Sequence, residues 1–318
     1  MRAVIARDFA PVIVDIPAPE PGPDELLVKV RAAALNRADV LQVRGKYPPP
    51  PGAPDTLGLE FAGDVLQVGE NVTNFAPGDR VMALVAGGAY AEQAVVHAGH
   101  AIPLPKDFTY EEAAAIPEAF VTAYSNLLLI GGLRESQRVL IHAGASGVGL
   151  AATQIAKLVG AQVFVTASAG KHDACRAAGA DMTIDYQTEN FAARILSEYP
   201  GVALVLDTVG APYWEDNLRV LEKWGKLVII GLQGGSSRTV NFGTIMRKRL
   251  TITGSTLRDR SKERKTHLIV DFAAWAMPHF TARTLRPTVW RVMTLDEVET
   301  AHQLMKDNAN AGKIVLRV

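Results

Sequence analysis

Short runs of alternating or β-branched residues, separated by Pro and Gly, fill the chain up to about residue 117. This pattern is typical of a compact domain with several strands at short intervals. Only brief helices fit there, and Asn36–Arg44 has helical spacing with Asn36 as a candidate cap. The prolines Pro48–Pro51 then force an extended loop, with Tyr47 at its entrance. The strands that we expect are Leu26–Val30, Gly63–Val68, Arg80–Leu84 and Tyr90–Val96.

From about Glu118 the pattern changes to alternating strands and helices. Such alternation predicts a parallel sheet covered by helices on both faces. We expect six strands, at Val139–Ala143, Gln162–Thr166, Met182–Tyr186, Val202–Asp207, Lys226–Ile230 and Leu250–Ser255. The helices between them are expected at Leu150–Val159, Lys171–Ala178, Asn190–Ser197 and Asp216–Lys223.

The last stretch of the chain alternates helix and strand in a way that suggests a return to the first domain. Its expected elements are a helix near Lys262–Met277, a strand near Pro287–Val292, a helix at Leu295–Lys306 and a strand at Lys313–Val318. We therefore predict an α/β protein with two domains, one of residues 118–257 and one of residues 1–117 with 258–318.

A glycine-rich turn joins the strand Val139–Ala143 to the helix Leu150–Val159, and its sequence is Gly144-Ala145-Ser146-Gly147-Val148-Gly149. Glycines let the backbone approach a pyrophosphate, and the free N–H groups and positive dipole end of the helix face its charge. The stretch is written G-x-x-G-x-G, whereas the standard dinucleotide fingerprint is G-x-G-x-x-G. A glycine-rich connection without a ligand is the alternative.

The end of the second expected strand indicates which dinucleotide would bind. A site for NAD usually has Asp or Glu about 20 residues past the glycines, bonded to the ribose hydroxyls. Here the place is held by Thr166–Lys171, which has no carboxylate. A hydroxyl at Ser168 and an ammonium at Lys171 can hold a 2′-phosphate, so NADPH is favoured. The alternatives are a helix cap for Ser168 and an exposed helix residue for Lys171.

Composition narrows the class of protein. The chain has 318 residues, 48% of them hydrophobic, with 33 basic and 33 acidic residues, so no net charge attracts nucleic acid or an anionic membrane. The charge cluster Arg247–Lys265 mixes signs and is expected to be a solvated face, with one phosphate contact as a further possibility. The single cysteine, Cys175, excludes an internal disulfide and is expected in the core. No run approaches eighteen apolar residues and no leader is evident, so we expect a cytoplasmic protein.

Many short motifs occur in an order and spacing that cover nearly the whole chain. In the first half these motifs are Leu35–Asp39, Tyr47–Gly52, Leu57–Glu60, Gly63, Gly69 and Pro77–Val81. In the second half they are His142–Gly144, Ser146–Gly149, Gly179–Ala180, Asp207–Gly210 and Gly312–Leu316. Together they resemble the motifs of the zinc-free quinone oxidoreductases of the medium-chain dehydrogenase/reductase superfamily, which include zeta-crystallin. The resemblance implies a Rossmann domain, a discontinuous GroES-like catalytic domain, NADPH in the cleft between them, and a homodimer joined along the strand near Leu250.

The resemblance also implies roles for single residues. It places Asn36 and Thr122 near the nicotinamide, and it brings Tyr47 near the electron acceptor. It assigns the glycine turn, with Gly144, Ala145, Ser146, Gly147 and Val148, to the pyrophosphate, and Ser168, Lys171 and Tyr186 to the 2′-phosphate. It assigns Gly231, Leu232, Ser255, Thr256, Leu257 and Asn310 to the nicotinamide ribose, although an ordinary strand-end turn is the alternative for each. Many relatives have Gly where this chain has Ser146.

Two ligands of the catalytic zinc in related alcohol dehydrogenases are a cysteine and a histidine. The equivalent positions here are Asn36 and Leu59, so we expect no metal. His97 and His100 lack a carboxylate or cysteine partner at ligand spacing, and we expect them to be surface or packing residues.

A substrate reduced without zinc must already accept hydride well. Quinones do, because the added charge is delocalised over the ring, and we expect an NADPH-dependent quinone reductase. An NADPH-dependent reductase of α,β-unsaturated carbonyls and a non-catalytic NADPH-binding protein are the alternatives. Tyr47 can act as a general acid or as a wall that packs against the acceptor ring, and we favour the wall.

Overall fold

The computed structural model describes residues 1–318, which fold into two units. Unit 1 contains Met1–Val121 and Leu257–Val318, and unit 2 contains Thr122–Thr256. The predicted fold class, a doubly wound parallel sheet of six strands with a separate mainly β domain, is confirmed.

Unit 1 is built on a largely antiparallel seven-stranded sheet of order β14-β15-β3-β4-β5-β7, in which β6 also pairs with β3. A separate hairpin of β1 and β2 has Asp8 and Phe9 in its turn, at φ 49° and 61°. Two central residues with positive φ suit the right-handed twist of a two-residue hairpin. The strands are β1 (Arg2–Arg7), β2 (Ala10–Asp15), β3 (Glu25–Ala34), β4 (Glu60–Val68), β5 (Arg80–Leu84), β6 (Gln93–His97), β7 (Ala101–Pro103), β14 (Val289–Thr294) and β15 (Lys313–Arg317).

The helices of unit 1 come from both ends of the chain. They are α1 (Arg37–Val43), α2 (Tyr110–Ala114), α9 (Lys262–Thr281) and α10 (Val298–Lys306), with 3₁₀ turns at Ala98–His100 and Leu295–Glu297. The unit boundary falls within α3 (Pro117–Tyr124), which continues as a π-helix over Ser125–Ile130. The sequence pattern did not predict α2, α3 or the π-helix.

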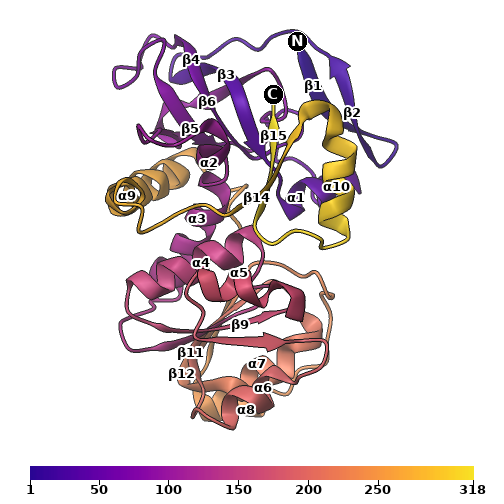
Figure 1. The fold of residues 1–318 in the computed structure, drawn as a ribbon, viewed down its shortest axis with the longest axis vertical. Coiled ribbons are helices and arrows are strands. Elements are labelled where there is room, and N and C mark those ends of the chain that lie inside the picture. Colours follow the sequence, from indigo (N-terminus) through magenta and orange to yellow (C-terminus); the bar gives the residue numbers. More distant parts are fainter. The chain divides into compact units, whose positions relative to one another are not determined.

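Unit 2 has the parallel strand order β10-β9-β8-β11-β12-β13, which is the order of a dinucleotide-binding sheet. Helices α4 and α5 lie on one face of this sheet and α6, α7 and α8 on the other (Figure 1). The strands are β8 (Arg138–Ile141), β9 (Gln162–Ala167), β10 (Met182–Asp185), β11 (Val202–Asp207), β12 (Leu221–Ile229) and β13 (Thr251–Gly254). The helices are α4 (Gly147–Leu158), α5 (His172–Ala177), α6 (Phe191–Leu196), α7 (Trp214–Val220) and α8 (Phe242–Lys248), with 3₁₀ turns at Ala169–Lys171 and Ala211–Tyr213.

One predicted boundary in unit 2 is wrong. The helix expected to run to Lys223 ends at Val220, because Leu221 is buried and already pairs with Val202 of β11. The next pair joins Leu204 to Lys226, so the residues between form a bulge, with Trp224 at φ 66°. A periodic pattern cannot show this early start of a bulged strand.

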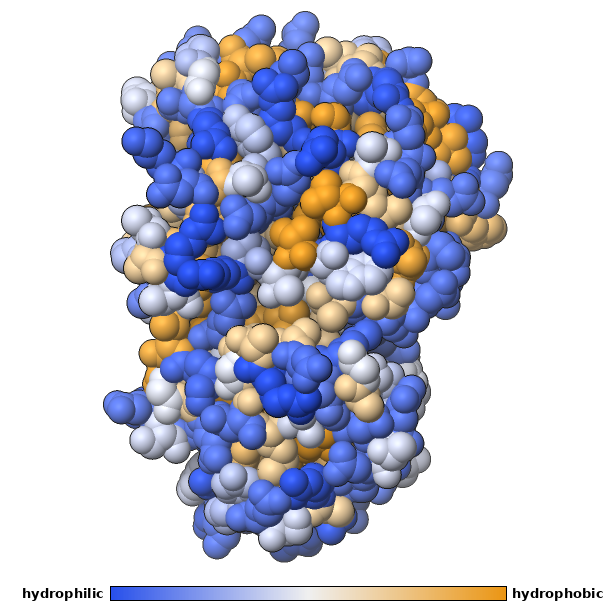
Figure 2. Space-filling view, viewed as in Figure 1, coloured by the Kyte–Doolittle hydropathy of each residue, from blue (hydrophilic) through white to orange (hydrophobic).

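The face in Figure 2 is mainly hydrophilic, with hydrophobic residues in scattered groups. None of the helices combines the length and the apolar character that a membrane span requires.

Candidate functional site

The glycine turn of unit 2 is shaped by two close approaches of the backbone. A Cβ on Gly149 would lie 2.4 Å from the carbonyl oxygen of Ala143, and one on Gly144 would lie 2.5 Å from Cβ of Val165. Neither position has room for a side chain. The turn therefore lies flat against β9, and α4 begins directly beside it.

Ser146 is the N-cap of α4. Its Oγ accepts a hydrogen bond of 3.0 Å from the amide of Gly149, which satisfies one of the free N–H groups at the helix start. The amides of Gly147 and Val148 belong to the first turn and have no intrahelical carbonyl to bond. A helix of 12 residues thus presents amides and its positive dipole end at this turn, which is suited to an anion.

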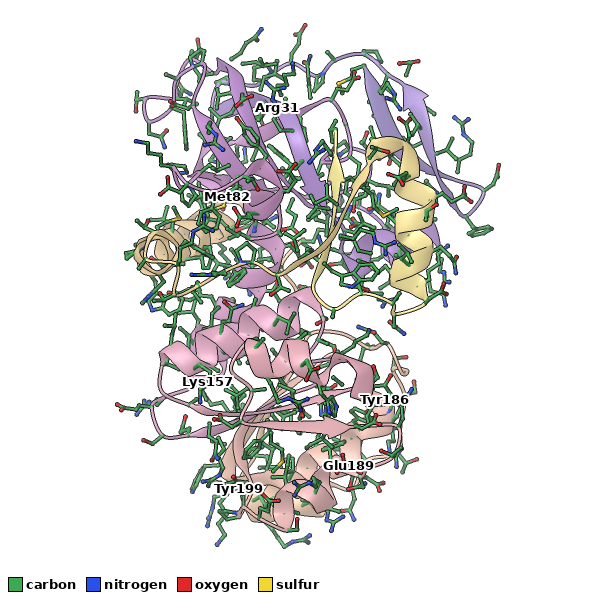
Figure 3. All side chains as sticks on the ribbon, in the orientation of Figure 1. Arg31, Met82, Lys157, Tyr186, Glu189 and Tyr199 are labelled. Atoms are coloured by element: carbon green, nitrogen blue, oxygen red, sulfur yellow. The ribbon has the colours of Figure 1, made fainter.

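The other predicted residues of unit 2 lie at one edge of its sheet, with the exception of Thr122. Each follows the carboxyl end of a parallel strand, which is the edge where doubly wound sheets bind ligands. Ser168 and Lys171 follow β9, Tyr186 follows β10, Gly231 and Leu232 follow β12, and Ser255 and Thr256 follow β13. Figure 3 labels Tyr186 at this edge, and its side chain is 47% exposed.

Thr122 lies in α3. Its carbonyl accepts a hydrogen bond of 2.8 Å from Nδ2 of Asn126, at the start of the π-helical stretch. Such stretches are common at functional sites, although this observation alone assigns Thr122 no role.

In unit 1, Asn36 lies in a buried ionic network. Its Nδ2 donates to Oε1 of Glu60 (3.0 Å), and its Oδ1 accepts from Nζ of Lys313 (2.7 Å). Lys313 and Glu60 form an ion pair of 2.6 Å, with side chains 5% and 0% exposed. Oε2 of Glu60 also accepts from the backbone amide of Glu118 (2.8 Å). The side-chain amide of Asn36 is thus engaged by two charged groups.

Asp39 extends this buried region. Its Oδ2 accepts from the hydroxyl of Tyr90 and from the backbone amide of Asn36, each at 2.7 Å, whereas Oδ1 has no partner. Burial is the main cause that raises the pKa of Asp39 to about 6, against an ordinary value of 3.8.

Tyr47 is held by a buried arginine. The guanidinium of Arg258 lies over the Tyr47 ring, 5.3 Å from its centroid, and its Nη1 donates to the Tyr47 carbonyl (3.2 Å). Its other nitrogens donate to Oε1 of Gln42 and to the carbonyl of Ala86, each at 2.7 Å. Burial raises the pKa of Tyr47, and the charge of Glu118 adds to the effect, so the phenol stays protonated.

The prediction that Arg247–Lys265 forms a solvated face is therefore wrong at two positions. Arg258 and Lys265 are 5% and 4% exposed, and Nζ of Lys265 donates to the carbonyl of Arg258 (2.9 Å). Backbone carbonyls and Gln42 take the place of water around these cations.

Glu118 is a half-buried acid in the same unit. Burial, followed by the nearby charge of Glu60, raises its pKa to about 8. Sequence reasoning gave no role to Glu60, Glu118, Arg258 or Lys313. The available signal was a charged residue directly beside an apolar run, as in Glu60-Phe61-Ala62 and Lys313-Ile314-Val315.

The structure shows burial or nearby hydrogen-bond partners for the remaining residues of unit 1 that the sequence singled out. Leu257 is buried, and Nδ2 of Asn310 donates to the carbonyl of Gly312 (2.6 Å). His97 accepts from the amide of Gly99, and His100 lies 3.2 Å from the carbonyl of Lys262. No three His, Cys, Asp or Glu side chains anywhere in the chain are grouped so that they could hold a metal ion. Cys175 is fully buried, as predicted.

Comparisons with known proteins agree with this architecture. The family model described as an alcohol dehydrogenase GroES-like domain matches residues 22–106, and the one described as a zinc-binding dehydrogenase matches residues 147–274. The two units thus define a medium-chain dehydrogenase/reductase.

Individual relatives narrow the class. A quinone oxidoreductase of Pseudomonas aeruginosa is 40% identical over 257 residues, which are 79% of this chain and 76% of that protein. The human synaptic vesicle membrane protein VAT-1 homolog is 32% identical over 314 residues, covering 94% of this chain and 80% of the relative. The structure of Escherichia coli quinone oxidoreductase complexed with NADPH has a TM-score of 0.90 at 28% identity, covering 100% of this chain and 99% of the other. This chain belongs to the zinc-free quinone oxidoreductase branch of the medium-chain dehydrogenases/reductases and is an NAD(P)H-dependent oxidoreductase.

Proposed function

We propose that this protein is an NADPH-dependent quinone reductase that works without zinc. The choice of cofactor rests on the residues at the end of β9. They include Ser168 and Lys171 but no carboxylate. A 2′-phosphate would meet an ammonium and a hydroxyl there, and Tyr186 follows the neighbouring strand β10. The solved relative from Escherichia coli carries NADPH, which supports the same choice.

The residues of unit 2 fit a dinucleotide. Gly144 and Gly149 let the turn pack closely against β9 and against the start of α4, and we propose that the first amides of α4 face a pyrophosphate. We propose that Gly144, Ala145, Ser146, Gly147 and Val148 hold the pyrophosphate, and that Thr122, Gly231, Leu232, Ser255 and Thr256 contact the nicotinamide half. In unit 1, the residues that we propose for the nicotinamide half are Asn36, Leu257 and Asn310. When bound, the nicotinamide supplies the hydride.

The absence of zinc ligands limits the acceptor to one that is already activated. The side-chain amide of Asn36 is engaged at both of its polar atoms, by Glu60 and Lys313, and we propose that these bonds fix the orientation in which Asn36 contacts the nicotinamide half. Tyr47, fixed by Arg258, provides a flat aromatic surface and one hydroxyl for a quinone ring. Water can protonate the hydroquinone anion after hydride addition, so no side chain need donate a proton in the transition state.

A reductase of α,β-unsaturated carbonyls is the second candidate. Its product needs a proton on carbon, and the observation that favours it is Glu118, whose pKa of about 8 keeps a proton available at neutral pH. Burial of Glu118 in the same unit as Tyr47 makes it the acid to test.

We also propose a homodimer. Strand β13 is the last of its sheet, so one side of its backbone is open to pairing. Phe242 and Met246 of α8 are 73% and 75% exposed and stand one helical turn apart, which suits burial against a second copy. Light scattering should then give twice the chain mass of 34.1 kDa. A monomer at micromolar concentration would refute this part.

One set of assays tests the proposed function. Oxidation of NADPH and of NADH is followed at 340 nm with 1,4-naphthoquinone and, separately, with an enal. We expect kcat/KM to be highest for NADPH with the quinone. Faster reaction with the enal, together with loss of that rate in Glu118→Gln, would favour the second candidate. Tight NADPH binding without oxidation by either acceptor would indicate a non-catalytic binding protein.

A further inference from the structure

His142 lies at the centre of a buried chain of hydrogen bonds in unit 2. Its Nδ1 is 2.9 Å from Oγ1 of Thr166, and its Nε2 is 2.8 Å from Oδ1 of Asn217. Nδ2 of Asn217 donates to Oδ2 of Asp207 at 3.1 Å. All four side chains are at most 1% exposed. Bulk water therefore does not reach any of these side chains.

Only one assignment of donors and acceptors fits the whole hydrogen-bond chain. Because Nδ2 of Asn217 faces a carboxylate, its Oδ1 faces His142 and must accept, so Nε2 of His142 carries the proton. Nδ1 is then free to accept from the hydroxyl of Thr166. Burial lowers the pKa of His142, which favours this neutral form. Bonds aligned in this way strengthen one another.

Three of the four members lie where a strand ends and a loop begins, and the fourth, Asn217, lies in α7. His142 follows β8 and precedes Ala143, which has φ 51°, and the glycine turn. Thr166 belongs to the end of β9, and its carbonyl accepts from the amide of Gly144 (2.9 Å). Asp207 ends β11, and its Oδ1 accepts from the amides of Val209 (2.6 Å) and Gly210 (3.2 Å).

The turn after β11 also holds the loop that follows β12. The amide of Gly234 donates to the carbonyl of Val209 (2.8 Å), and the amide of Ala211 donates to the carbonyl of Gly235 (3.0 Å). Movement of the Asp207 turn would therefore be transmitted to this second loop. The hydrogen-bond chain thus joins the glycine turn, the end of β9 and the loops after β11 and β12.

We propose that the hydrogen-bond chain Thr166–His142–Asn217–Asp207 holds these cofactor-binding loops in fixed positions relative to one another. His142 is the central member of this hydrogen-bond chain. The proposal rests on the proposed binding of NADPH at these strand ends. Its effect is on affinity for the cofactor, since none of the four side chains is exposed to touch it. The sequence motif His142–Gly144 then has a physical role that the glycines alone do not explain.

The first test needs no cofactor. Amide hydrogen exchange is measured for residues 144–149 and 207–210 in the wild type and in His142→Phe. Phenylalanine keeps the ring contacts of His142 with Phe191 and Tyr213, at centroid distances of 4.7 and 4.6 Å, but removes both hydrogen bonds. We expect exchange in both segments to become at least tenfold faster. Unchanged exchange in both would overturn the proposal.

The second test measures NADPH affinity by fluorescence titration well below the melting temperature. We expect His142→Phe to bind at least tenfold more weakly, and His142→Gln, whose amide can still donate to Asn217, to stay within about threefold of the wild type. A lower melting temperature with unchanged affinity, or equal losses in both variants, would overturn the proposal. If the wild type binds neither NADPH nor NADH, the proposed function fails, and the exchange experiment still decides this inference.

A matched control comes from the other end of the sheet. Tyr199 accepts a hydrogen bond of 3.1 Å from Gln162, and Figure 3 shows it at the edge opposite Tyr186. Tyr199→Phe should leave affinity and loop exchange unchanged, and an equal loss there would overturn the proposal. Should His142→Phe not fold, Thr166→Val removes the first bond with little change of shape. It should speed exchange at residues 144–149 at least threefold, and unchanged exchange would again contradict the proposal.

Discussion

Replacing Lys313 with Met tests the buried ionic network of unit 1. Nζ of Lys313 pairs with Glu60 at 2.6 Å and donates to the carbonyl of Leu35 (2.6 Å) and to Asn36 (2.7 Å). Methionine keeps the length and apolar stem of the side chain but leaves the carboxylate of Glu60 buried without its counter-charge. Removing one partner of such a pair costs about 3–5 kcal/mol of unfolding free energy.

The dependence on pH separates this cause from lost packing. A stranded carboxylate can take up a proton instead, and for a glutamate with a reference pKa of about 4.3 this costs about 4 kcal/mol at pH 7 and about 1 kcal/mol at pH 5. The folded variant then binds a proton that the unfolded chain does not, so its stability falls as the pH rises. The penalty for Lys313→Met relative to the wild type should be about 3 kcal/mol larger at pH 7 than at pH 5.

Urea denaturation at the two pH values gives the penalty directly. The matched control is the double variant Glu60→Gln with Lys313→Met, in which position 60 carries no carboxylate, so the penalty should depend much less on pH than in Lys313→Met. A penalty for Lys313→Met that is equal at pH 5 and pH 7 would refute the reasoning.

Three further predictions concern the cofactor, the acceptor and the Asp39 region. Lys171→Ala should lose about 1.5–3 kcal/mol of a charge-assisted contact, and so bind NADPH more than tenfold more weakly with little change for NADH; unaltered NADPH affinity in titrations would overturn the assignment. Tyr47→Phe should lose one hydrogen bond of about 1 kcal/mol and less than tenfold in kcat with quinones, whereas a hundredfold fall with NADPH binding intact would make Tyr47 a proton donor. Because the pKa of Asp39 is raised to about 6 by burial, the folded state holds more protons than the unfolded state from about pH 4 to 6, and stability falls by about 3 kcal/mol as the pH rises through this window. In Asp39→Asn the fall over this window should be smaller by about 3 kcal/mol in melting curves, while the part that comes from the raised pKa of Glu118 remains, and an unchanged slope would contradict the cause.

The sequence was sufficient for the parts of the fold that depend on local patterns. Apolar runs separated by helical periods predicted all six strands of unit 2, and the glycines of the turn were recognisable because only glycine allows such close approach. The end of α7 at Val220 was not predictable, because it is decided by pairing of Leu221 with a neighbouring strand. Tertiary pairing here overrides local helical periodicity.

The sequence likewise predicted only part of the candidate site. The strand-end residues of unit 2 follow from topology, since parallel strands bring their carboxyl ends to one edge. The environment of Asn36 does not follow from topology, because Glu60 and Lys313 come from distant parts of the chain. A single charged residue in the sequence gives no sign of its partner. Arg258 was predicted to be solvated for the same reason. Its true partners are backbone carbonyls and Gln42, which composition cannot reveal.

The central claim is that hydride passes from NADPH to a quinone without a metal. It is tested most directly by a single turnover of the enzyme–NADPH complex with 1,4-naphthoquinone, before and after dialysis against a strong chelator, with the metal content measured on the same samples. The account predicts less than one tenth of a zinc per chain and equal rates in both samples, each slowed by deuterium at the transferred position of the nicotinamide. One zinc per chain, with a rate that falls on chelation and returns when zinc is added, would contradict it.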